Sequence, residues 1–174
     1  ALFLRAHYHF EMWRMWKNIP YYTEEDEDFR KTNVGTDVLP LIISDLNAAI
    51  DLLPLPEDQD GVGRVNVWVA EAVKGRVQVY QEDWSGALAT LRNVVDNGPY
   101  MLEENFHNAF SVAHNNGPET ILAYQASVND GNPNGENGNR ADRLNFPHSG
   151  SPFGCCGFHQ PPQNLVNVYK VGAD

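Results

Sequence analysis

Four segments within the first 100 residues place their apolar side chains three and four positions apart, which is the period of an α-helix. The segments cover about residues 1–18, 38–53, 66–81 and 84–97, and a shorter helix is expected over 164–169. Side chains that cap helix starts, and prolines or glycines that end helices, stand at the boundaries of the long segments. The sequence therefore predicts a mostly α protein.

The third and fourth segments are predicted to form a helical hairpin. A glycine inside a helix costs about 1 kcal/mol relative to alanine, so Gly75 indicates a close helix crossing, and Gly98 is expected to end the fourth helix in the left-handed conformation. Four positions agree with a tetratricopeptide repeat, a hairpin of about 34 residues: Gly75, Ala87, Leu91 and Pro99. The repeat's tryptophan, leucine and tyrosine positions do not match, so a plain hairpin remains the alternative.

The first helix carries a narrow polar stripe. His7, Glu11 and Arg14 stand at positions i, i+4 and i+7, and Glu11 and Arg14 are close enough to pair. Apolar residues cover most of the remaining circumference, which predicts a helix packed between neighbours. Trp13 and Trp16 follow the helical spacing and are assigned to the core.

The last third of the chain has a different character. Residues 119–128 alternate in polarity, which predicts one half-buried strand. Residues 129–162 contain 6 Gly, 6 Asn and 5 Pro, half of that segment, and predict a long irregular loop. We therefore divide the chain into a helical scaffold with a terminal strand, residues 1–128, and a second part, residues 129–174, made of the loop and the short helix.

The acidic composition excludes a nucleic-acid partner. The chain has 12 Lys and Arg against 23 Asp and Glu, for a formal net charge of −11, whereas phosphate backbones are bound by clustered cations. No run approaches the roughly 20 apolar residues of a membrane-spanning helix, and no signal-peptide pattern opens the chain. Because the first residues already follow the helical period without an initiator methionine, we expect the chain to be a piece of a longer protein.

Seven short motifs follow one another in an order that we compare with known families. They are Arg5–Trp13 with the exit Asn18-Ile19-Pro20, Ile43–Leu46 with Leu53-Pro54, Gly63–Asn66, Tyr80–Trp84, Tyr100–Leu102, Pro118–Leu122 and Gln160–Val166. This ordered set resembles the SusD/RagB-type glycan-binding lipoproteins over essentially the whole chain. Pro118 stands where that family usually has asparagine.

The resemblance implies a fold and a function. The fold would be a SusD-like α superhelix of tetratricopeptide-like hairpins, with a minor β segment and a long loop that begins the variable, ligand-binding part. The function would be that of a non-enzymatic protein at the cell surface, held in the outer membrane by an N-terminal lipid anchor that is absent here. It would capture an oligosaccharide or polysaccharide and deliver it to a SusC-like TonB-dependent transporter.

The loop carries the predicted ligand contacts. Glycans are bound by flat aromatic faces and by planar polar side chains, and in the resembling family the ligand-facing aromatics tend to lie outside the repeats. The candidate ligand-binding residues are Arg140, Arg143, Phe146, Phe153, Phe158 and His159. Ordinary packing or transporter contact is the alternative role for this loop.

A calcium site is a second hypothesis for the loop. The run from Asp130 to Gly135 matches the first half of a D-x-N-x-N-G calcium loop. Ala141 stands where the bidentate glutamate belongs, so a simple turn loop is the alternative. The calcium ligands would be Asp130, Asn132, Asn134 and Asp142. No other cofactor is expected.

Two further interpretations stay open. An enzyme would need an isolated catalytic pair, and the local suggestion is Cys155 or Cys156 near His159. The adjacent cysteines are interpreted as two ordinary thiols, because a disulfide between neighbours is strained. A peptide-docking tetratricopeptide domain usually has three or more repeats, whereas one convincing unit is visible.

Overall fold

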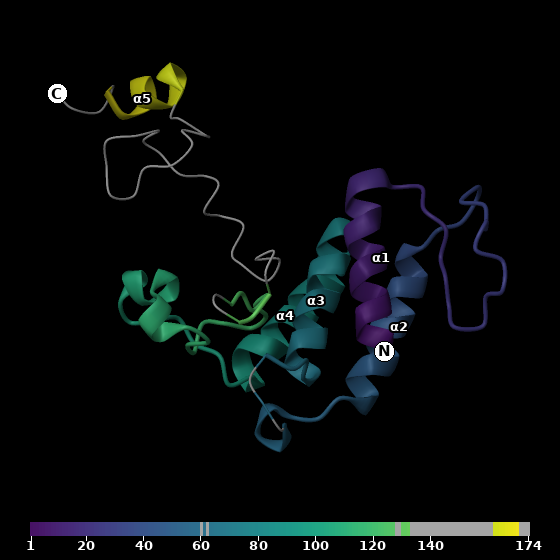
Figure 1. Ribbon diagram of the computed structural model, residues 1–174, viewed down its shortest axis with the longest axis horizontal. Coiled ribbons are helices and arrows are strands. Elements are labelled where there is room, and N and C mark those ends of the chain that lie inside the picture. The colour runs from purple at the N-terminus through teal and green to yellow at the C-terminus, as the bar shows by residue number, and fades with distance from the viewer. Residues whose placement is uncertain (60, 62, 128–129, 133–161, 171–174) are drawn as a thin grey trace. The chain divides into compact units, whose positions relative to one another are not determined.

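The computed structural model describes residues 1–59, 61, 63–127, 130–132 and 162–170. The described helices are α1 (Leu2–Trp16), α2 (Leu39–Leu52), α3 (Val67–Tyr80), α4 (Trp84–Asn97) and α5 (Gln163–Lys170), shown in Figure 1. Three short 3₁₀ turns cover Pro56–Asp58, Phe106–Phe110 and Val112–His114. The prediction of a mostly α protein is confirmed. None of the described helices has the length and apolar character needed to cross a membrane.

The chain divides into two compact units, residues 1–124 and residues 125–174. Within the first unit, α2 packs against both α1 and α3, and α4 packs against α3. The fully buried side chains of this unit come from α1, α2, α3 and the residue before α2; the largest are Phe10, Ile42, Leu46, Val38, Val69 and Val77. In the second unit, α5 agrees with the predicted short final helix.

Side-chain caps begin the two helices of the hairpin. The Asn66 side chain accepts a hydrogen bond from the Val69 N–H (3.1 Å), and the Asp83 side chain accepts one from the Gly86 N–H (3.0 Å). α4 ends at Asn97 as predicted, with Gly98 after it, but Gly98 has φ −75° and ψ 161° and not the left-handed conformation. The residue before a proline favours extended backbone, and Pro99 follows Gly98 directly.

The two helix tryptophans differ in burial. Trp13 is partly buried and packs against the core. Trp16 is 62% exposed, so its assignment to the core is wrong. Trp16 is the last residue of α1, and Lys17 after it has a φ of 61° that ends the helix. Helical spacing therefore identifies the correct face of α1 but not the position at which its burial ends.

The predicted strand is not formed by the described residues 119–127. A strand needs a ladder of backbone hydrogen bonds with a neighbour. Here the Thr120 N–H instead donates to the Gly117 carbonyl (2.9 Å) in a turn, and the Met101 N–H donates to the Pro118 carbonyl (3.1 Å). Ile121 packs against the core from this irregular segment. The polar alternation thus reflects packing on one side and no sheet.

Gly75 lies at a close crossing of α3 and α4, as its place in the sequence predicts. A Cβ atom at this position would lie 2.5 Å from Leu91 Cδ2 and 2.6 Å from Leu91 Cγ. Carbon atoms of real side chains do not approach so closely, so any substitution at residue 75 must displace Leu91. The absence of a side chain at this position lets the two helices pack together.

We expect Gly75→Val to destabilise the chain by about 1–3 kcal/mol, because a branched side chain overpacks the contact with Leu91. Urea denaturation of the two proteins measures this loss. Gly75→Ala is the control: its single methyl meets only the side chain of Leu91, which is the smallest displacement that a substitution here can require, and its helix propensity is better by about 1 kcal/mol, so we expect a much smaller change. A valine variant as stable as the parent protein would contradict the close crossing.

Candidate functional site

Most residues predicted to bind a ligand fall outside the described part of the chain. These are Arg140, Arg143, Phe146, Phe153, Phe158 and His159, the calcium candidates Asn134 and Asp142, and Cys155 and Cys156. Their roles stay predictions.

Two calcium candidates are described. Asp130 accepts hydrogen bonds from the Ser127 hydroxyl (2.6 Å) and from the Asn132 N–H (3.0 Å). These bonds form a local turn around the carboxylate. Among the described residues, no three His, Cys, Asp or Glu side chains are grouped so that they could hold a metal ion. The calcium site therefore stays a hypothesis, and a calcium-dependent thermal shift would test it.

The polar stripe of α1 faces an open groove within the first unit. The groove has a volume of about 700 Å³. His7, Glu11 and Arg14 line it from α1, Arg76 lines it from α3, and the run 119–124 passes along it. Val69, Ala72 and Val73 of α3 supply an apolar lining. We call this feature the α1–α3 groove.

His7 connects α1 to the run 119–124. Its Nε2 is hydrogen-bonded to the Tyr124 hydroxyl, and its ring stacks on Phe3 with 5.9 Å between the ring centroids. The side chain of His7 is buried, and burial lowers its pKa against the opposing effect of Glu11. His7 is therefore neutral at pH 7, and it fixes the hydroxyl end of an otherwise exposed tyrosine ring.

The charged side chains of the groove differ in the hydrogen bonds that they make. Arg14 donates to both carboxylate oxygens of Glu11, at 2.9 Å and 2.7 Å, and this hydrogen bonding raises the pKa of Arg14. Arg76 Nη1 lies 3.8 Å from Glu11 Oε1, too far for a hydrogen bond. Both guanidinium groups lie over the buried Phe10 ring, 5.9 Å and 5.8 Å from its centroid. The core therefore supports the cations of the groove.

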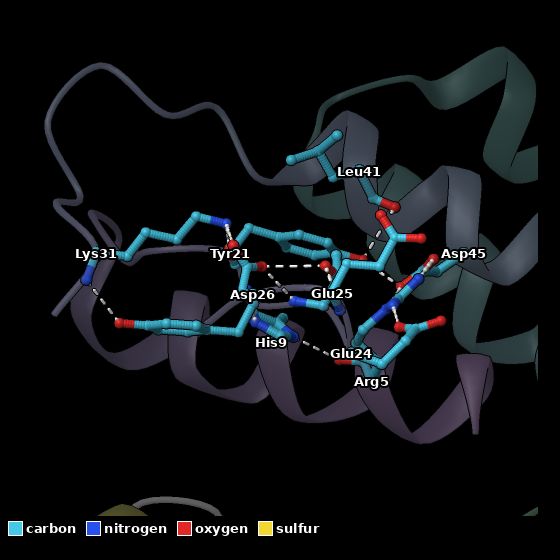
Figure 2. Close-up of polar contacts among 11 residues, drawn as sticks. Arg5, His9, Tyr21, Glu24, Glu25, Asp26, Lys31, Leu41 and Asp45 are labelled. Carbon is cyan, nitrogen blue, oxygen red and sulfur yellow. Dashed lines mark hydrogen bonds and ion pairs between the residues drawn. The ribbon is translucent and has the colours of Figure 1, made fainter. Parts of the chain in front are cut away.

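A second polar cluster joins α1 and α2 (Figure 2). The Nε and Nη2 atoms of Arg5 each donate to Asp45, both at 2.6 Å. The Tyr21 hydroxyl also donates to Asp45, and Arg5 forms an ion pair with the exposed Glu24. Burial and the hydrogen bond to Asp45 raise the pKa of Tyr21, so this hydroxyl remains a neutral donor. This cluster fixes α1 on α2 and is separate from the residues that line the groove.

His9 attaches the segment after α1 to the helix. The Tyr22 N–H donates to His9 Nε2 (3.0 Å), so the ring hydrogen is on Nδ1, which lies 2.8 Å from the Arg5 carbonyl oxygen. Both ring nitrogens are therefore occupied by structural hydrogen bonds. His9 thus has a structural role.

Sequence reasoning identifies the side of the groove that α1 forms. The spacing of His7, Glu11 and Arg14 shows a shared helix face, and the structure makes that face the groove wall. Sequence reasoning misses Arg76 and Tyr124, because no local spacing connects α3 or the run 119–124 to α1. The one available signal for Arg76 is its place next to Gly75, which is predicted to lie at a close helix crossing.

Comparisons with known proteins identify relatives for the helical part. Residues 1–79, from α1 into α3, match the SusD-like family model described as "Starch-binding associating with outer membrane". The chain is 29% identical over 140 residues to a SusD-like protein of Bacteroides ovatus, covering 72% of this chain and 25% of that protein. It is 25% identical over 114 residues to SusD-like protein P25 of Formosa agariphila, covering 63% and 21%. The chain thus spans a quarter or less of the length of these curated relatives.

Solved structures give the same result for the fold. A SusD superfamily protein from Bacteroides vulgatus matches with a TM-score of 0.59 and 27% identity, over 70% of this chain and 26% of that one. A SusD-like protein from Bacteroides fragilis matches with a TM-score of 0.60 and 22% identity, over 74% and 27%. The second likeness shows the fold alone.

Proposed function

The chain is SusD-like in sequence and in helical fold, and from this premise we propose that it is the scaffold part of a glycan-binding protein at the outer-membrane surface. The match of residues 1–79 to a starch-binding family is the observation that carries the proposal. The protein would be anchored by a lipid and would pass captured oligosaccharides to a SusC-like TonB-dependent transporter. SusD-like proteins are binding proteins, so the proposed mechanism involves no bond cleavage.

The α1–α3 groove has the chemistry that saccharide binding needs. The exposed Tyr124 ring offers a flat face to the C–H surface of a sugar. Arg76 lines the groove with a planar group whose N–H donors suit pairs of hydroxyls, and Glu11 and Arg14, which pair with each other, line it beside Arg76. The apolar lining from α3 gives the mixed surface that is typical of small-molecule sites. We therefore propose the groove as a saccharide contact in addition to the predicted loop residues.

Affinity gel electrophoresis against a panel of plant, algal and host polysaccharides tests this function. We expect at least one polysaccharide to retard the protein. Tyr124→Ala should bind it about two- to tenfold more weakly, because an aromatic contact contributes about 0.5–1.5 kcal/mol. Phe29→Ala is the control, since Phe29 is an exposed aromatic residue that does not line the groove.

The outcomes separate the parts of the proposal. Equal retardation of both variants would keep glycan binding and move the site away from the groove. If no polysaccharide retarded the protein, the proposed function would be wrong and the peptide-docking interpretation of the α3–α4 hairpin would take its place. Co-purification with a SusC-like transporter from outer-membrane extracts tests the delivery step separately.

A further inference from the structure

Arg76 is the least satisfied cation in the α1–α3 groove. Its side chain is 49% exposed, and its ion pair with Glu11 spans 3.8 Å. Within the described part of the chain, no hydrogen-bond acceptor lies within bonding distance of its guanidinium group. Arg14, which lines the groove from α1, already donates two hydrogen bonds to Glu11. Both of those bonds come from Arg14 Nη1, whereas the guanidinium group of Arg76 makes no hydrogen bond to the described residues.

The other charged groups of the groove do not hydrogen-bond to Arg76. The two oxygens of Glu11 are both engaged by Arg14. Glu119 Oε2 accepts a hydrogen bond from the Glu103 N–H (3.0 Å), so this carboxylate is bound to the segment that follows α4. His7 is neutral, and its Nε2 is occupied by the Tyr124 hydroxyl. Among the described residues of the groove, the Arg76 guanidinium thus has Glu11 as its near counter-ion, at 3.8 Å, and makes no hydrogen bond to it.

Arg76 lies against an aromatic ring of the core. Its guanidinium carbon lies 5.8 Å from the centroid of the Phe10 ring, and Phe10 is fully buried. Cation–π contact of this kind holds the planar group against the aromatic ring. A guanidinium group presents a fork of N–H donors that matches a carboxylate or a sulfate in a bidentate manner.

We propose that the groove binds acidic saccharides, with Arg76 holding the carboxylate or sulfate group of one sugar unit and Tyr124 contacting its ring. This inference rests on the proposed function and names its substrate class. The net charge of −11 makes the protein as a whole repel polyanions. Retention of an acidic glycan therefore requires a local cation, and Arg76 is placed to supply it.

Matched pairs of polysaccharides test the inference by affinity gel electrophoresis. Polygalacturonate is compared with its methyl-esterified form, and a sulfated galactan with its desulfated form, so that the two anionic groups are distinguished. We expect the protein to bind one or both acidic members at least tenfold more tightly than the neutral partner. Arg76→Gln should remove this preference, and Arg76→Lys should restore part of it, because lysine keeps the charge but not the fork.

Arg92→Gln is the matched control, because Arg92 is exposed on α4 and does not line the groove. It should bind like the parent protein. Urea denaturation of each variant verifies that it folds, and Arg76→Lys keeps the test decisive if Arg76→Gln is unstable.

Three results would overturn the inference. Equal binding of acidic and neutral glycans, unchanged by Arg76→Gln, would refute acidic selectivity and leave the proposed function intact. A preference for acidic glycans that survives Arg76→Gln would refute the assignment to Arg76. Failure to bind any glycan would refute the proposed function and the inference together.

Discussion

Asp45→Ala is expected to destabilise the chain by about 3 kcal/mol, because it leaves the largely buried Arg5 with only the exposed Glu24 as a counter-ion. Asp45 accepts two hydrogen bonds from Arg5 and one from Tyr21 at the α1–α2 interface. The side chains of Arg5 and Asp45 are only 20% and 10% exposed, so water cannot fully replace the lost carboxylate. Urea denaturation measures the change.

Glu24→Gln is the control for Asp45→Ala. Glu24 pairs with the same arginine, but its side chain is 75% exposed. Exposed ion pairs contribute about 0–1 kcal/mol, so this variant should be nearly as stable as the parent protein. Similar losses for the two variants would show that the cluster does not hold α1 on α2.

The Asp45 carboxylate also makes the stability of the fold depend on pH. Burial opposes the ionisation of Asp45, but hydrogen bonds from Arg5 and Tyr21 outweigh burial and lower its pKa. In the unfolded chain an aspartate has a pKa of about 3.9. The stabilisation is therefore complete above that value and is lost as the pH falls through the lower pKa of the folded state. Asp26, whose pKa is lowered to about 2 by Lys31, acts in the same direction.

Urea denaturation at a series of pH values from about 7 down to about 3 checks this sign. Stability should fall below about pH 4, near the unfolded-state pKa. In Asp45→Asn the acid-dependent loss should be smaller, because the substituted side chain no longer titrates. An unchanged acid-dependent loss in the asparagine variant would assign the effect to other carboxylates.

Local spacing predicts the helices well, because the pattern that specifies a helix lies within a short stretch of sequence. The caps Asn66 and Asp83 and the crossing at Gly75 all follow from residues close to them in the sequence. The pairing of Arg5 with Asp45 does not, since 40 residues separate them. Both stand in motifs that resemble SusD-like proteins, but a motif does not state which side chains touch.

The run 119–124 shows why sequence reasoning misses the part of the groove that lies outside α1. Its alternation of polar and apolar residues is equally consistent with a strand and with an irregular segment that buries one side. In the structure this run is an irregular segment that buries one side. Ile121 packs on the core, whereas Tyr124 is exposed at the groove. Only the folded arrangement brings Tyr124 to His7, which is 117 residues away.

Phe10 links the core to the groove, and Phe10→Ala is expected to destabilise the chain by about 3–5 kcal/mol. The ring is fully buried and meets the Tyr80 ring edge to face, with 5.3 Å between centroids. Its removal would leave a cavity that rigid neighbours on α1 and α3 fill only in part. Urea denaturation measures the loss of stability.

The same substitution should also weaken glycan binding, because Arg14 and Arg76 would lose the aromatic surface beneath their guanidinium groups. Phe10→Leu separates the two effects: it keeps most of the buried volume, so its loss of stability should be smaller, but it removes the aromatic ring. We therefore expect the leucine variant to be folded and to bind acidic saccharides more weakly than the parent protein. A leucine variant with full affinity would show that the Phe10 ring supports the core without orienting the cations of the groove.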